Sequence, residues 1–215
     1  PTSQQKDAGT ALSKSGLGLQ DANARSYGKA ESFNMLIPDL MGSSSFSGFS
    51  EDGPVAQSLT KYGARQLAQQ LPPYWGDQPG TGGPTYIGAV IIFLCALGLF
   101  LLRGRYKWWV VAISLIALML AWGSNFMWFT KLFFNYFPGY SKFRTVAMIL
   151  VIMEWSVPFI AALLMSKLWK EEVSAQQVKK ASLYALYAVG GLTLFFLMFG
   201  GTLFDFLNAY DKSLM

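Results

Sequence analysis

The chain of 215 residues is too apolar for an ordinary soluble domain, because 53% of its residues are hydrophobic and 13% are charged, against about 25% charged in typical soluble proteins. It has no histidine and one cysteine, Cys95, which excludes His-dependent nucleophile pairs, His metal sites and an intrachain disulfide. We therefore expect no metal and no cofactor. The net charge of +5 is concentrated in short breaks between apolar runs, which favours a role in membrane topology and argues against nucleic-acid binding.

The first 84 residues are polar and rich in Gly and Ser, and we predict a loop-rich, partly helical segment outside the cytoplasm. A helix is predicted over residues 54–71, where Pro54 suits a first turn and apolar residues recur at near-helical spacing. Gly63 weakens this prediction. Two stretches are loops by composition: 43–53 and 76–83.

The remainder of the chain contains four apolar runs that approach the roughly 20 residues needed to cross a bilayer core about 30 Å thick. The predicted fold class is therefore an all-α integral membrane protein with about four transmembrane helices. Four buried helices of a soluble protein would need a polar exterior that the chain barely possesses. The predicted spans within the transmembrane region 85–204 are 85–102, 108–123, 145–166 and 181–204.

The charges of the connecting loops predict the orientation of these spans. Basic residues cluster between the first and second spans and between the third and fourth, so both loops should be cytoplasmic. Residues 1–84, the loop 124–144 and the tail 205–215 would then lie outside. Residues 1–84 carry no basic and apolar signal segment of their own, so we expect a signal or helix upstream and a longer protein. The basic residues of the two loops are Arg103, Arg105, Lys107, Lys167, Lys170, Lys179 and Lys180.

An aromatic stretch follows the second span, with a single cation, Lys131. It could form an interfacial helix or continue the second helix into an aromatic belt. The charge of Lys131 and the break at Pro138 and Gly139 favour a short separate helix that turns back toward the membrane.

Three stretches carry a family resemblance: residues 26–44, SYGKAESFNMLIPDLMGSS, residues 71–89, LPPYWGDQPGTGGPTYIGA, and residues 137–148, FPGYSKFRTVAM. In this order they resemble the YfhO-like bacterial membrane proteins, although Asp39 and Ser43 depart from the Asn and Gly that are common there. The resemblance implies a GT-C-type glycosyltransferase fold in the bacterial inner (cytoplasmic) membrane. Its outer loops would bind a polyprenyl-phosphate sugar as substrate, and the acceptor would be an envelope glycan, lipid or protein. The catalytic carboxylate of such enzymes generally lies in the first outer loop, so this chain would be an internal portion downstream of it.

The turn before the third span offers candidates for binding the lipid phosphate. Arg144 could bind phosphate oxygens through paired hydrogen bonds, or it could be an ordinary interfacial arginine. Lys142 is a weaker candidate for the same anion, and Tyr140 belongs to the same turn.

The stretch 74–78 suits sugar binding, because aromatic rings can stack on a sugar while polar groups bind its hydroxyls. Tyr74, Trp75 and Gln78 are the candidate binding residues, and Asp77 is a weak candidate for a general base. Asp77 could equally be a turn carboxylate that accepts hydrogen bonds from loop N–H groups.

Glu154 is the one acidic residue within the predicted third span. We expect it to be buried as a neutral group that is hydrogen-bonded to a neighbouring helix, with a kink near Pro158. A proton relay is the alternative.

The leading functional hypothesis is a glycosyltransferase, and the alternatives are a transporter or flippase of an envelope precursor and a non-catalytic membrane scaffold.

Overall fold

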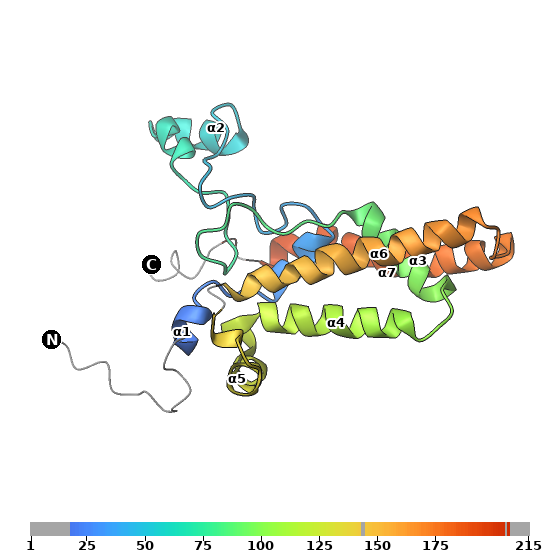
Figure 1. Cartoon of the computed structure of the whole chain (residues 1–215). Coiled ribbons are helices and arrows are strands. Elements are labelled where there is room, and N and C mark those ends of the chain that lie inside the picture. Colours follow the sequence, from blue (N-terminus) through green and yellow to red (C-terminus); the bar gives the residue numbers. More distant parts are fainter. Residues whose placement is uncertain (1–17, 143–144, 205, 207–215) are drawn as a thin grey trace.

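The computed structural model describes residues 18–142, 145–204 and 206, and every regular element within these residues is a helix. The four longest helices are α3 (Ala89–Leu101), α4 (Tyr106–Ala121), α6 (Val151–Trp169) and α7 (Ala175–Leu203). They run in alternating directions, with α3 against α6 and α7, and α4 against α6 (Figure 1). The predicted all-α fold is confirmed.

The number of helices that can cross a membrane is smaller than predicted. Two helical stretches are long and apolar enough, Val146–Trp169 and Ala175–Leu203, and the bent pair formed by α4 and the helices after it would make a third if it is one span. The first predicted span yields only the 13 residues of α3, about 20 Å at 1.5 Å per residue, which is less than the bilayer core. Gly88, at φ +111°, and the extended Leu102 set its ends. The expectation of four spans is thus corrected to two or three.

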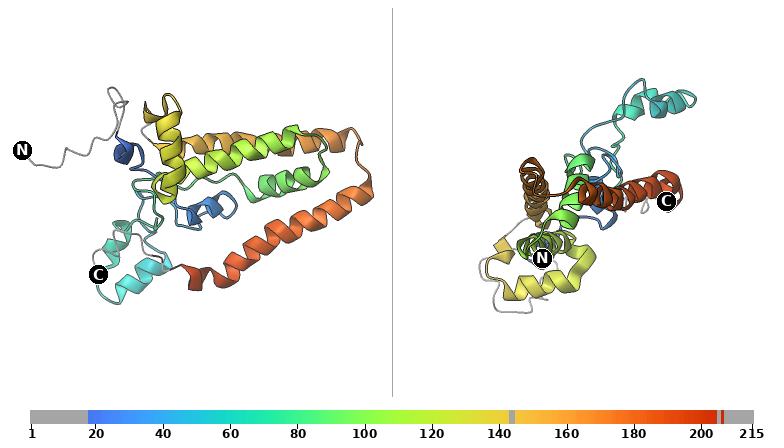
Figure 2. Two further views of the ribbon diagram at one scale, coloured as in Figure 1. Left: turned by 90° about the horizontal axis from the view of Figure 1, so that it is seen from below. Right: turned by 90° about the vertical axis from the view of Figure 1, so that its right-hand side faces the viewer.

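The aromatic stretch after α4 forms a separate helix. A short 3-10 helix, η3 (Gly123–Phe126), leads into α5 (Met127–Tyr136), and the bend between α4 and this pair is 112°. Gly123 has φ +45°, which breaks the direction of α4. Figure 2 shows α5 lying across the end of α4, beside the start of α6. Of the two predicted arrangements, the structure has the short separate helix and not a continuation of α4.

The polar segment that precedes the bundle packs on one end of it. This end, called here the docking end, comprises the last turn of α4, η3, the 3-10 helix η5 (Val146–Leu150) and the last turns of α7. The Tyr27 N–H donates to the Ala121 carbonyl at 2.9 Å, and the Asn125 amide donates to the Tyr27 carbonyl at 3.0 Å. The Trp122 indole donates to Ser32 at 2.9 Å. These bonds join residues about a hundred positions apart and fix the segment to the bundle.

The start of this polar segment contains α1 (Leu19–Ala22) and the 3-10 helix η1 (Ala30–Met35). Tyr27 and Met35 are buried against Ala121 and Leu150 in one apolar cluster. A second cluster, formed by Leu97, Leu164, Ala181 and Ala185, holds α3, α6 and α7 together farther along the bundle.

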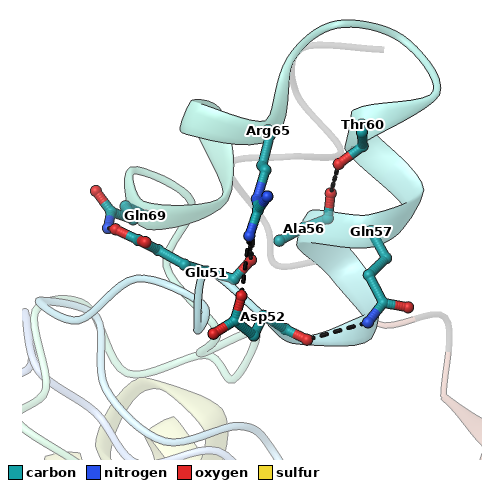
Figure 3. Close-up of polar contacts among 7 residues, drawn as sticks. All are labelled: Glu51, Asp52, Ala56, Gln57, Thr60, Arg65 and Gln69. Carbon is teal, nitrogen blue, oxygen red and sulfur yellow. Dashed lines mark hydrogen bonds and ion pairs between the residues drawn. The ribbon is translucent and has the colours of Figure 1, made fainter.

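Residues 49–70 form a small lobe that projects away from the bundle (Figure 1). It holds α2 (Pro54–Thr60) and the 3-10 helix η2 (Arg65–Gln69), so the predicted helix 54–71 is confirmed in its first half and broken at Gly63, which has φ +68°. Arg65 pairs with Asp52 at 2.9 Å and also donates to the Glu51 carbonyl (Figure 3). The two stretches predicted as loops, 43–53 and 76–83, contain no helix or strand.

Candidate functional site

The polar segment packed on the docking end contains a buried carboxylate, Glu31, that was not among the predicted site residues. Glu31, on η1, is 1% exposed. Its Oε2 accepts the Gly28 N–H at 2.9 Å, and its Oε1 accepts the Gln78 N–H at 3.1 Å and the Tyr74 hydroxyl. We call these four residues the Glu31 cluster. A carboxylate can be buried at tolerable cost only when donors satisfy it in this way.

A tyrosine hydroxyl and a glycine near Glu31 allow this cluster to form. The Tyr27 hydroxyl donates to the Glu31 carbonyl at 2.9 Å, which fixes the turn that carries the acid. Gly76 lies directly against the carboxylate, since a Cβ at this position would collide with Glu31 Oε1. The first two sequence blocks, 26–44 and 71–89, therefore meet at Glu31.

Asp77 lies beside the Glu31 cluster and is exposed. Its Oδ2 is 2.9 Å from the position that a Cβ of Gly28 would occupy. The next residue, Gln78, is held through its N–H, which is bonded to Glu31 Oε1 and, at 3.0 Å, to the Tyr74 hydroxyl. The Glu31 cluster thus positions an accessible carboxylate at its edge.

Trp75, which the sequence suggests as a stacking residue for a sugar, is engaged in packing. Its ring centroid is 5.2 Å from that of Phe204 and 5.0 Å from that of Phe206, beyond the end of α7. The backbone N–H of Trp75 donates to the Met41 carbonyl at 3.0 Å. Trp75 therefore connects the loop 71–78 to α7, and only part of its half-buried ring remains accessible.

The two tyrosines of this site are neutral at physiological pH. Burial and the negative charge of Glu31 raise the pKa of Tyr27 and of Tyr74 well above the ordinary value for a phenol. Both hydroxyls can therefore donate hydrogen bonds throughout the physiological range. Tyr74 uses its proton to bond Glu31 and its oxygen to accept the Gln78 N–H.

The predicted phosphate-binding turn lies apart from this cluster. Tyr140, in the 3-10 helix η4 (Tyr140–Lys142), is buried with Leu120 and Val146, and burial raises the pKa of its phenol. Within the described part of the chain, its hydroxyl has no hydrogen-bond partner. Lys142 is exposed on the same turn, and Arg144 lies outside the described residues. The structure thus groups Tyr74, Asp77 and Gln78 around Glu31, and it places Tyr140 in a separate packing cluster.

Glu154 was expected to be buried, and in the structure it is exposed. Glu154 lies in the first turn of α6, close to the docking end, and its side chain is exposed on the helix surface. Among residues 18–142, 145–204 and 206 it makes no side-chain hydrogen bond to a neighbouring helix. The helix also continues through Pro158 without interruption. Glu154 is thus near the start of α6, and it is the ninth residue of the 24-residue stretch Val146–Trp169 that could cross a membrane.

Glu31 and Tyr27 are the residues that sequence reasoning missed. The sequence feature that could have indicated them is the spacing of Tyr27, Gly28 and Glu31, which fall within about one helical turn. This spacing alone does not predict burial, because the deciding partner, Tyr74, is 43 residues away in the chain.

Comparison with known proteins gives no match to any protein-family model, to any curated protein or to any solved structure.

Proposed function

We propose that the protein is part of a membrane glycosyltransferase that transfers a sugar from a polyprenyl-phosphate donor to a cell-envelope acceptor. The observation that supports this proposal is the Glu31 cluster, which joins the first two blocks of the resemblance at one end of an apolar helical bundle. A lipid-linked sugar needs such a place, since its lipid chain remains among apolar helices while its polar head reaches an ordered polar site.

Asp77 is the residue that we assign to the donor sugar. Its carboxylate is exposed and is held at the edge of the Glu31 cluster, so it can accept hydrogen bonds from sugar hydroxyls. Glu31 is buried and acts as a positioning residue through the Gln78 N–H. Lys142 is an exposed cation on the turn before η5 and, with Arg144, is the candidate for the lipid phosphate.

In the proposed reaction, the acceptor oxygen forms a bond to the anomeric carbon of the sugar. The bond from that carbon to the phosphate oxygen breaks, and its electron pair leaves with the polyprenyl phosphate. The acceptor proton passes to a carboxylate acting as general base. The resemblance places this base in an upstream loop, so Asp77 has a binding role in the proposal.

The transporter alternative has less support than the enzyme. The reason to consider a transporter is that Glu154 and the proline break at Pro158 lie in one predicted span, because transporters typically bind substrates at discontinuous helices near the bilayer centre. In the structure α6 is continuous through Pro158, and Glu154 lies in its first turn.

The test uses the purified full-length protein, including the upstream loop to which the proposal assigns the base, in proteoliposomes that contain a polyprenyl-phosphate hexose, with release of free polyprenyl phosphate measured by mass spectrometry. We expect Asp77→Asn to raise the KM for the donor about tenfold or more, because a hydrogen bond to a charged group is lost. The control is Asp52→Asn, the same change in the projecting lobe, and it should leave KM unchanged.

Each result of this test has one meaning. No release of polyprenyl phosphate by the unchanged protein would overturn the proposed function and favour a scaffold. Release with the same KM in Asp77→Asn and Asp52→Asn would retain the activity and overturn the role of Asp77.

A further inference from the structure

A cavity of about 560 Å³ lies at the opposite end of the bundle from the Glu31 cluster. It is formed where α3 and α6 end and α7 begins, which is the far end of the long helices in the left view of Figure 2. We call this region the basic end, and the positive-inside rule predicts that it faces the cytoplasm. The polar residues of its lining are Arg103, Lys167, Glu172, Gln177, Lys180 and Tyr184.

The cavity has an excess of positive charge. Its three cations face one carboxylate, Glu172, whose oxygen is 3.6 Å from Lys167 Nζ. In the part of the chain that the structure describes, no carboxylate pairs with Arg103 or Lys180. Three positive charges and one negative charge leave a net charge of +2. Both unpaired cations are exposed and can reach an anion in the cavity.

A nearby cation, Lys107, has a structural role that Arg103 and Lys180 lack. Lys107 lies at the same end, but its Nζ donates to the Leu99 carbonyl at 2.5 Å and sits 5.3 Å from the centre of the Trp108 ring. Lys107 therefore binds a carbonyl near the end of α3, and it does not line the cavity. Arg103 and Lys180 have no such structural use.

The walls of the cavity are apolar beside these charges. Phe100 and Tyr184 lie with their ring centroids 6.0 Å apart, and Leu101, Val173 and Ala181 complete the wall. The Tyr184 hydroxyl and the Gln177 amide add polar groups to the same lining. A site with two free cations next to an apolar wall suits an anion that is attached to an apolar chain.

We propose that this cavity binds a phosphate group, held by Arg103 and Lys180. The guanidinium can bind two phosphate oxygens at once, and the ammonium adds a point charge. The apolar wall favours the headgroup of an anionic phospholipid over a soluble phosphate. This site is separate from the proposed transferase site, so the two proposals stand or fall independently.

The test compares two double variants of the whole protein in nanodiscs made from equal parts of phosphatidylglycerol and phosphatidylcholine. Arg103→Gln with Lys180→Gln removes the two free cations of the cavity. Arg105→Gln with Lys179→Gln removes the same two residue types from exposed positions at the same end, outside the lining. The lipids that remain bound after transfer to detergent are counted by native mass spectrometry.

We expect the unchanged protein and the Arg105/Lys179 variant to retain phosphatidylglycerol preferentially. The Arg103/Lys180 variant should lose this preference by about tenfold or more, because it loses direct charge-assisted hydrogen bonds to the phosphate, which Arg105 and Lys179 do not make in the proposal. The single variant Arg103→Gln, at an exposed position, should show a partial loss and serves as a second test if the double variant is unstable.

A second arm separates the two sources of phosphate by titrating inorganic phosphate against the detergent-solubilised protein. Phosphate binding that needs Arg103 and Lys180, without a lipid preference, would support the anion site and overturn the lipid as its source. An equal loss of phosphatidylglycerol in both double variants would overturn the site, because general surface charge would then explain the binding.

Discussion

Replacing Tyr74 by phenylalanine removes one buried hydroxyl from the Glu31 cluster and changes little else in shape. The hydroxyl donates to Glu31 Oε1 and accepts the Gln78 N–H at 3.0 Å. A hydrogen bond to a charged group contributes about 1.5–3 kcal/mol. In this variant the Glu31 carboxylate would still accept the N–H groups of Gly28 and Gln78, so it keeps two hydrogen-bond donors. We therefore expect a loss near the lower part of this range, about 2 kcal/mol.

The loss should be local and measurable by hydrogen exchange. A change of about 2 kcal/mol makes local opening roughly 30 times more frequent, so the amides of peptides covering 26–36 and 73–79 should exchange faster by about that factor. The matched control is Tyr62→Phe, since Tyr62 is 84% exposed and lies in the turn between α2 and η2 of the projecting lobe. Equal protection in the Tyr74→Phe and Tyr62→Phe variants would refute the account of the Glu31 cluster.

The remaining predictions concern stability and are all measured by thermal unfolding in one detergent. Gly76→Ala places a Cβ against Glu31, whereas Gly82→Ala meets no atom within 4 Å. The first variant should lose about 1–3 kcal/mol of unfolding free energy, and the second under about 0.5 kcal/mol. Equal losses would contradict the close approach of Gly76 to Glu31. The pKa of Tyr74 is raised above its ordinary value of 10.0, so its stabilising contribution should be complete below pH 10 and decline as the pH rises further. Tyr74→Phe should reduce this decline, and an unchanged decline would assign it to other groups. The Arg65–Asp52 pair has side chains 55% and 92% exposed, so Asp52→Asn should change stability by under about 1 kcal/mol, and a larger loss would show that the pair organises the lobe.

The sequence predicted the class of the structure and many of its boundaries. Long apolar runs with few charges predict helices, and the last two predicted spans correspond to helical stretches of 24 and 29 residues. The first was predicted too long, because hydropathy does not register the conformation of single glycines. The second has the predicted length in α4, but its 16 residues do not qualify as a span by themselves, and the chain bends after them. Gly88 and Gly123, both with positive φ, set the start of α3 and the bend after α4.

The candidate site was predicted in part. The stretch 74–78 lies at an ordered polar site, as its composition suggests, and two of its residues, Tyr74 and Gln78, bond directly to Glu31. Trp75 is used for packing against Phe204, which follows α7 and is remote in the sequence. This second use could not be predicted, because it depends on where the last long helix ends.

The sequence by itself determined that the chain forms apolar helices behind a polar, loop-rich segment, since the length and composition of each run are local properties. The tertiary structure alone decided which acids are buried. Glu154 lies in an apolar run but is exposed near the start of α6, whereas Glu31 lies in a polar segment and is 1% exposed. The physical reason is that a carboxylate can be buried only where donors converge on it, and for Glu31 two of these donors come from Tyr74 and Gln78, more than 40 residues away.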